Sequence, residues 1–444
     1  MPALTAHIAL IGSTTSTSSS TYVDVTASIS GTMKASTKYL VMCSAHVTSD
    51  NSARPWGMRL IERSIAAGAV EIDTSEVIRE ATNVGRENPY MWTGIYTTTS
   101  TAPNDGGIIL QQKDVSGTDT ISTEYASLVV LELTELNEGT DYFVTTDATE
   151  ATETEGLVER VQHEIDPATA GPWLVLGFVS TDVNAVIADS TNIVFTQTTI
   201  TDGTPTATVT SDLMFEGEDT SEIIPNVQSW TQDYTGVDSV EWKIETKGVK
   251  QSGGTPSIFN KYLASSLVGL RLSALENYST DASNVAKDVS SAFLPWFDSN
   301  TITPDTTGTV VFVGTQSGYT DGTGRSWDTK FTYDDGGGEA VLPNAVQSTT
   351  DSFRSYDRTD VLSTLFVATL AVDSGTEYAY EYYLREFSND PQAEGRSAAI
   401  VGFTLETLAT DPVRYSSEAG EVFSAGQQES ETYSAGQQAG EITG

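Results

Sequence analysis

The fold is decided by the stretch Tyr39-Leu40-Val41-Met42-Cys43-Ser44-Ala45-His46-Val47, in which two sets of side chains alternate. Residues two apart share a face of a β-strand, so the alternation predicts a strand whose inward face carries Cys43. A similar apolar segment, Trp173-Leu174-Val175-Leu176, begins 134 residues later, and Val310-Val311-Phe312-Val313 begins 137 residues after that. This recurrence indicates that one structural unit is repeated along the chain.

A second recurring segment closes each unit. Ser127-Leu128-Val129-Val130-Leu131 corresponds to Ser266-Leu267-Val268-Gly269-Leu270 and to Ala399-Ile400-Val401-Gly402-Phe403, at offsets of 139 and 133 residues. Both anchors give a period of roughly 135 residues. The segments around Trp92, Trp230 and Leu365 recur at a similar spacing between them. We predict repeats at residues 1–137, 138–275 and 276–408, followed by a C-terminal extension at 409–444.

Each unit has the pattern of antiparallel β-structure. Residues 22–29, 239–244 and 309–313 show the alternation of strands, β-branched Val and Thr are common in the units, and Asp-Gly pairs separate such segments. Several short strands in about 135 residues predict an all-β chain of three tandem β-sandwich or jelly-roll-like domains. Placed in line, three compact domains of this size would span roughly 110 Å.

Two segments favour short helices instead. Leu157, Val161 and Ile165 lie four residues apart, and the same spacing recurs within residues 285–293. Because a spacing of four puts side chains on one helix face, we expect short helices that cap an open end of a sandwich. This interpretation places His163 on the polar side of the first helix.

The charge balance is strongly acidic along the whole chain. It has 61 acidic and 22 basic residues, of which only nine are lysine, and a formal net charge of −39. Self-repulsion of this size strains a compact state at ordinary ionic strength, whereas molar salt shortens the Debye length to about 3 Å. The composition therefore indicates a protein of a salt-loving system, and its sign disfavours binding to nucleic acid.

Export and membrane signals are not visible in the sequence. Residues 1–7 lack a basic start followed by an apolar segment, and no apolar run approaches 18 residues. We therefore expect no membrane span. Cys43 is the only cysteine, so no disulfide can form within the chain, and we interpret it as a small core residue. A virion component, assembled in the host cytoplasm and released by lysis, fits these features.

Catalytic signatures are lacking as well. Only His7, His46 and His163 would titrate near neutral pH without perturbation, and each fits a structural role. The sequence contains no Gly-x-Ser-x-Gly, His-Glu-x-x-His or P-loop pattern. We predict that the protein is not an enzyme, has no catalytic residues and uses no organic cofactor.

Two local patterns are candidate ligand sites. Asp334, Asp335 and Glu339 flank three glycines, which would let oxygen ligands converge on Ca²⁺ or another hydrated cation. An acidic hairpin loop without a metal is the alternative interpretation. Trp327 lies in a loop-like context, Gly324-Arg325-Ser326-Trp327-Asp328, and is the best candidate for an exposed aromatic binding residue.

Two further patterns concern assembly. Lys243, Lys247 and Lys250 cluster in an otherwise lysine-poor chain, as expected either for a subunit contact or for a solvated edge strand. The decapeptide at 421–430 repeats at 431–440, which places Phe423 and Tyr433 ten residues apart. These two aromatics could dock into equivalent pockets of an assembly, or the terminus could pack on its own domain.

The chain resembles surface structural proteins of haloarchaeal tailed viruses, namely tail fibres, capsid turrets and decoration proteins. The resemblance rests on the Thr/Ser-rich opening Gly12-Ser13-Thr14-Thr15-Ser16-Thr17-Ser18-Ser19-Ser20-Thr21-Tyr22-Val23-Asp24-Val25, the tandem β-units and the N-terminus described above. It implies a homo-oligomer, a trimer or a pentamer, in contact with other virion proteins and with a host surface glycan or S-layer. The competing hypothesis is a cell-surface adhesin or glycan-binding protein of a halophile.

Overall fold

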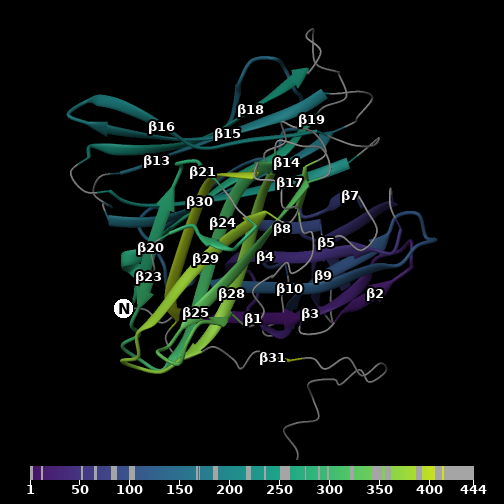
Figure 1. The fold of residues 1–444 in the computed structure, drawn as a ribbon, viewed down its shortest axis with the longest axis horizontal. Helices are drawn as coiled ribbons and strands as arrows, with labels where there is room; N and C mark the ends of the chain where they lie inside the picture. The colour runs from purple at the N-terminus through teal and green to yellow at the C-terminus, as the bar shows by residue number, and fades with distance from the viewer. Residues whose placement is uncertain are drawn as a thin grey trace, which may run out of the picture.

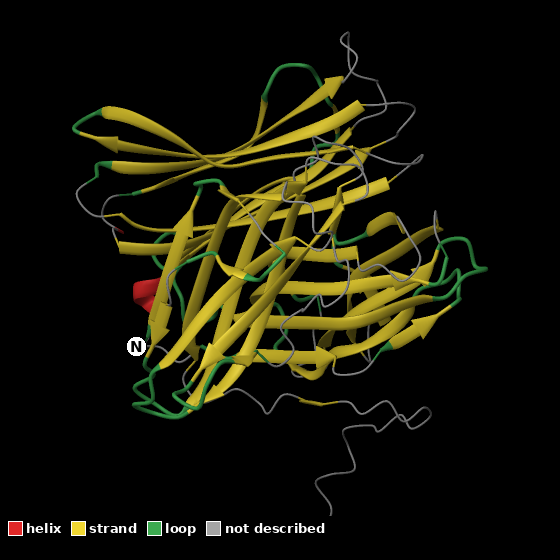
Figure 2. Ribbon diagram, in the orientation of Figure 1, coloured by secondary structure: helices red, strands yellow, loops and turns green. Residues whose placement is uncertain are grey.

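A computed structural model gives the fold. It describes residues 4–11, 14–51, 54–64, 68–81, 88–99, 106–166, 169, 171–183, 189–216, 222–234, 237–250, 261–275, 277–288, 291–297, 300–320, 325–342, 353–355, 362–386, 393–405 and 413–414. Strands make up most of these residues, and the 3₁₀ turn η2 (Leu272–Ala274) is drawn as the helical piece in Figure 2. Within the described residues, no helix is long and apolar enough to cross a membrane.

The first unit is a pair of facing sheets. Its inner sheet has the order β1 (Ala6–Ile11), β10 (Ile121–Glu132), β4 (Lys38–Ser49) and β8 (Asn88–Thr97), with β2 (Thr15–Thr17) beside β10 and β31 (Val413–Arg414) beside β1. Its outer sheet has the order β3 (Val23–Met33), β9 (Gly106–Asp114), β5 (Arg54–Ser64) and β7 (Val77–Ala81), with β6 (Gly68–Glu71) beside β5.

The second unit repeats this plan. Its inner sheet has the order β11 (Tyr142–Asp147), β19 (Lys261–Arg271), β14 (Gly171–Val183) and β17 (Glu222–Tyr234), with β12 (Ala151–Thr152) beside β19. Its outer sheet has the order β13 (Val158–Ile165), β18 (Ser239–Lys250), β15 (Asp189–Thr201) and β16 (Thr204–Glu216). One residue pair, Ile223 opposite Ile78, joins β17 to β7, so this inner sheet continues into the outer sheet of the first unit.

The third unit has the same plan with shorter outer strands. Its inner sheet has the order β20 (Tyr278–Ser283), β30 (Ala393–Leu405), β24 (Gly308–Thr320) and β28 (Leu362–Val372), with β21 (Lys287–Asp288) beside β30. Its outer sheet has the order β22 (Leu294–Pro295), β29 (Tyr378–Glu386), β25 (Arg325–Asp334) and β26 (Ala340–Val341), with β23 (Asn300–Ile302) beside β29 and β27 (Phe353–Ser355) beside β25.

The strand order identifies the unit as a jelly roll. When the main strands of a unit are numbered in chain order, the inner sheet runs 1-8-3-6 and the outer sheet 2-7-4-5 in all three units. In the third unit, β22 and β23 share the second place, and β26 and β27 share the fifth. Two antiparallel sheets in this double Greek-key order form a jelly roll. The predicted fold class, an all-β chain of three tandem β-sandwiches, is confirmed.

The inner sheets bury both of their faces. In β24, Val310 and Phe312 point into the core of the third unit, whereas Val311 and Val313 belong to a second cluster. That cluster also contains Leu174 and Leu176 of β14 and the apolar residues of β4, so all three units contribute to it. We call it the shared core. The edge strand β17 contacts β8 of the first unit and β28 and β30 of the third.

The shared core corrects the expected arrangement. The units converge on one another in Figure 1, so they are not placed in line. The physical reason is visible in β4, where every residue from Tyr39 to Ser49 is buried. A sheet that is apolar on both faces needs a second layer on its far side. The alternation in the sequence identified the inward face of Cys43 but not the partner of the opposite face.

The predicted short helices are also wrong. Residues 158–165 form strand β13, which pairs with β18, and the described part of 285–293 contains strand residues but no helix. A spacing of four is a multiple of two as well as about one helical turn, so Val161 and Ile165 can share a strand face equally well. Both side chains are buried in the core between the two sheets of the second unit. His163 lies between them on that same face rather than on a polar helix side.

Glycines in the inner strands make room for aromatic rings. A Cβ added to Gly269 would lie 1.9 Å from the ring of Phe143, and one added to Gly314 would lie 2.0 Å from the ring of Phe366. Contacts this short exclude a side chain unless the ring moves. The glycine that follows valine in these inner strands is therefore explained by the aromatic ring packed against it.

Candidate functional site

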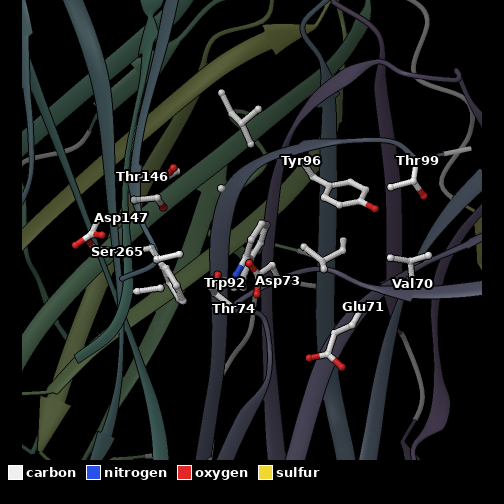
Figure 3. Close-up of a pocket in the computed structure, with 17 residues that line it drawn as sticks. Val70, Glu71, Asp73, Thr74, Trp92, Tyr96, Thr99, Thr146, Asp147 and Ser265 are labelled. Atoms are coloured by element: carbon white, nitrogen blue, oxygen red, sulfur yellow. The ribbon is translucent and has the colours of Figure 1, made fainter. Parts of the chain in front are cut away.

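A pocket of about 360 Å³ lies where the first and second units meet. It is bordered by β8 and the residues 70–74 on the first unit, and by β11, β14 and β19 on the second. We call it the junction pocket. In Figure 3, Thr146, Asp147 and Ser265 of the second unit approach it from one side, and Trp92, Tyr96 and Glu71 of the first unit from the other.

Three rings line this pocket, and we call them the aromatic wall: Trp92, Tyr96 and Phe178. The rings of Trp92 and Phe178 come from different units, with their centroids 6.1 Å apart and their planes tilted by 57°. Both side chains are buried, whereas Tyr96 is half-buried and its hydroxyl donates a hydrogen bond of 2.6 Å to Glu62. The wall is therefore held in place by packing and by a buried acceptor.

The rim of the junction pocket is polar. Glu71 pairs with Arg59 at 2.5 Å, and Asp147 accepts a hydrogen bond of 2.9 Å from the backbone of Thr149. Asp73 is exposed and makes no hydrogen bond or ion pair with the residues that the structure describes. Its neighbour Thr74 has a φ of 64°, a left-handed conformation that is strained for a β-branched residue. Strained backbone of this kind tends to occur at functional sites.

The chemistry available in the junction pocket is narrow. None of its seventeen lining side chains is a lysine, arginine or histidine. Apart from the carboxylates and the indole N–H of Trp92, its polar side-chain groups are hydroxyls, among them those of Thr99 and Ser266. The wall offers stacking and hydrogen bonding, as in binding pockets that are mostly apolar with a few placed polar groups.

Sequence reasoning did not single out this pocket, although one signal was present. In the aligned inner strands, Ser44 and Thr315 occupy the position of Phe178, so a large aromatic replaces a small polar residue in the second unit only. Asp73 and Tyr96 carried no comparable signal.

The candidate metal ligands lie at the hairpin between β25 and β26. Asp334 accepts hydrogen bonds from the backbones of Gly336 (2.7 Å) and Gly338 (3.0 Å), and Asp335 accepts one from Gly337 (3.0 Å). Glu339 pairs with Lys330 at 2.7 Å. The three carboxylates thus already have partners, and no group of three or more acidic, histidine or cysteine side chains able to hold a metal occurs in the described part of the chain.

Trp327 and the lysine cluster lie on regular strands. Trp327 belongs to β25, opposite Glu386, and not to a loop; its side chain lies outside the described residues. Lys243 and Lys247 point away from the second unit's core on β18, and Lys243 pairs with Glu245 at 3.2 Å. Because β18 lies between β13 and β15, it is not an edge strand.

The remaining sequence-predicted assembly residues cannot be placed. The backbone of Lys250 pairs with Asp189, but its side chain lies outside the described residues. Phe423 and Tyr433 lie wholly outside them. The segment before them does reach the fold, since Val413 of β31 lies parallel to Ala9 of β1.

Two of the histidines and Cys43 lie in packed surroundings. His163 stacks on Phe143 with centroids 3.8 Å apart, and its Nδ1 lies 3.0 Å from the Thr145 hydroxyl. Burial lowers the pKa of His163 and of His7 below the usual value, and burial raises the pKa of the Cys43 thiol. Burial thus favours the neutral form of all three groups.

Comparisons with known proteins give distant structural neighbours. No protein-family model matches the chain, and no curated protein matches it. Among solved structures, one titled as the triple jelly-roll fold and turret assembly of an archaeal virus shares 8% identity over 89% of this chain and 91% of its own, with a TM-score of 0.18. The STIV MCP shares 11% identity over 59% and 97%, with a TM-score of 0.24.

A third neighbour is the tandem CBM22 domain of Xyn10C from Paenibacillus barcinonensis. It shares 11% identity over 55% of this chain and 82% of its own, with a TM-score of 0.22. TM-scores this low do not establish a common fold. The jelly-roll architecture therefore rests on the strand order of the three units.

Proposed function

We propose that the chain is a non-enzymatic structural protein of a virus that infects a halophilic archaeon, exposed on the particle as an oligomeric turret, decoration or tail fibre. The observation that carries this proposal is the shared core, to which Met42, Leu176 and Val313 contribute, one from each unit. It makes three jelly rolls into one body. Jelly rolls are recurrent building blocks of viral capsids and of lectins.

The shared core favours a mechanical role. Each fully buried Leu, Val or Met contributes about 1.5–3 kcal/mol, so joining the inner sheets strongly opposes separation of the units. A rigid body with its apolar surface collected inside leaves a charged exterior. A net charge of −39 suits a surface that faces brine, because screening there relieves the repulsion.

The test is the location of the protein. Particles purified by density gradient from a lysed culture of the source organism should contain its peptides by mass spectrometry, in constant ratio to the other particle proteins across the gradient. Recovery in the cell-envelope fraction, with none in the particles, would contradict the proposal. That result would favour a cell-surface adhesin or glycan-binding protein, the alternative that the junction pocket supports.

A further inference from the structure

The junction pocket offers an aromatic surface whose rings are fixed. Trp92 and Phe178 are only 4% and 2% exposed, and they are held by the packing of two units against each other. The accessible ring of the wall is the half-buried Tyr96, and a ring already held by a hydrogen bond to Glu62 loses little conformational entropy when a ligand stacks on it. The volume of about 360 Å³ lies at the lower end of the range of small-ligand sites, which begins near 300 Å³.

Besides the indole N–H of Trp92, the polar side-chain groups around this surface are hydroxyls and carboxylates. The hydroxyls of Thr74, Thr146 and Ser266 can both donate and accept hydrogen bonds, while the free carboxylate of Asp73 only accepts. A ligand that satisfies them needs several hydroxyl groups of its own together with an apolar face. Pyranose sugars combine these two features, because their axial C–H bonds form an apolar face and their hydroxyls lie around the rim.

The charges around the pocket favour a neutral sugar over a charged ligand. An anionic ligand would meet carboxylates and no basic side chain on the described wall. An organic cation could lie over the rings. Its attraction to Asp73 would be screened over about 3 Å in molar salt and would compete with the salt's own cations. Stacking and hydrogen bonding keep their strength under those conditions.

We infer that the junction pocket binds a neutral carbohydrate, with one sugar ring stacked on Tyr96, the half-buried ring of the aromatic wall, and its hydroxyls hydrogen-bonded to the rim. This site lies between the units and differs from the one anticipated at Trp327. The inference is independent of the virion role, since the same pocket would serve a turret or an adhesin.

The experiment is calorimetric titration of the full-length protein in about 2 M KCl. The probes are neutral oligosaccharides of glucose, galactose, mannose and rhamnose, with choline as the cationic probe. We expect saturable binding of at least one oligosaccharide, with an affinity that stays constant or rises up to about 3 M KCl. Failure of every oligosaccharide to bind, or tighter binding of choline, would overturn the inference.

A matched pair of variants locates the binding. Ala148 and Thr149 are neighbouring exposed residues, but only Ala148 lines the pocket. Ala148→Trp should fill the pocket and weaken binding more than tenfold, whereas Thr149→Trp should bind like the wild type. Equal affinities of the two variants would overturn the inference.

A third variant tests the aromatic wall. Phe178→Thr installs the residue type that Thr315 has at the equivalent position of the third unit. Binding by this variant should fall at least tenfold while its thermal unfolding still shows a folded protein. Unchanged binding would place the sugar elsewhere. None of these outcomes bears on whether the protein is found in particles.

Discussion

Met42 lies directly opposite Val129 on the neighbouring inner strand, and the equivalent pairs Leu176–Val268 and Val313–Val401 have the same register. All six side chains belong to the shared core. Two sequence anchors that recur independently are therefore cross-strand partners in every unit. Each anchor pair presents one face to its own outer sheet and the other to the neighbouring units.

We expect the three units to unfold together, because the shared core links them. Leu176→Ala should cost about 2–5 kcal/mol and also accelerate hydrogen exchange in β4 and β24 of the other units. Leu213→Ala is the matched control, since Leu213 is equally buried but lies in the second unit's own core. Exchange measured by mass spectrometry should change in β4 only for Leu176→Ala. Independent unfolding of the units in calorimetry would contradict the shared core.

Glycine substitutions should separate steric from conformational effects. Gly269→Ala would force a Cβ to within 1.9 Å of the Phe143 ring, whereas at Gly402 the nearest atom, in Phe312, lies at 3.0 Å. Overpacking of a buried site costs typically about 1–3 kcal/mol. Gly269→Ala should therefore lower the free energy of unfolding by that amount, measured by urea denaturation, and Gly402→Ala by clearly less. Equal losses would show that strand propensity, not ring contact, selects these glycines.

The stacked His163 should make stability depend on pH. Burial lowers the folded-state pKa of His163 below the usual 6.5 of the unfolded chain. Between the folded-state and the unfolded-state pKa, the unfolded chain therefore binds more protons than the folded one. The stability that this group contributes is complete above pH 6.5 and is lost as the pH falls from that value through the lower folded-state pKa. His163→Phe should keep the stack on Phe143 and reduce the drop in thermal midpoint between about pH 7.5 and 5.5. His7 shifts the same way, so His7→Gln should reduce the drop independently; an unchanged slope in both variants would refute this account.

The sequence predicted the fold class because β-periodicity and repetition are local signals. It could not predict the convergence of the units, because alternation in β4 shows that two faces differ without showing what covers the second. The four-residue spacing of Val161 and Ile165 suits a strand as well as a helix, and pairing with β18 decides between them. The anchor around Trp92 matched Trp230 only approximately, since their partners Cys43 and Val175 are two positions apart in the aligned strands. The sequence marked Phe178 as unusual among the aligned strands but could not predict the junction pocket itself, because Trp92 and Phe178 meet only after two units dock.

Salt should raise the stability of this protein strongly. Of 83 charged residues, 61 are acidic, and the ion pairs with exposed partners, such as Lys38–Glu138, offset little of the repulsion. The thermal midpoint followed by circular dichroism should rise steeply between about 0.1 M and 2 M KCl as the Debye length falls from about 10 Å to below 3 Å. Sucrose at equal osmolarity is the control for general solute exclusion. A midpoint that does not change with KCl would remove the basis for a halophilic origin.

The C-terminal residues are expected to contribute to assembly. β31, the last described segment before residues 415–444, runs beside β1 at the edge of the first unit's inner sheet. They are rich in Gly, Gln, Ser and Glu, and ordering them would cost about 1–2 kcal/mol per residue. Phe423 and Tyr433 supply too little apolar surface to offset that cost within the segment, whereas a neighbouring subunit could supply the rest.

Deletion of 415–444 should therefore lower the oligomeric mass, measured by light scattering in molar salt, without changing the thermal midpoint. The full-length double variant Phe423→Ser/Tyr433→Ser controls for chain length and should show the same loss. If the truncated protein keeps its full oligomeric mass, the segment is not an assembly element, and if the intact protein is a monomer in high salt, the proposed homo-oligomer is wrong.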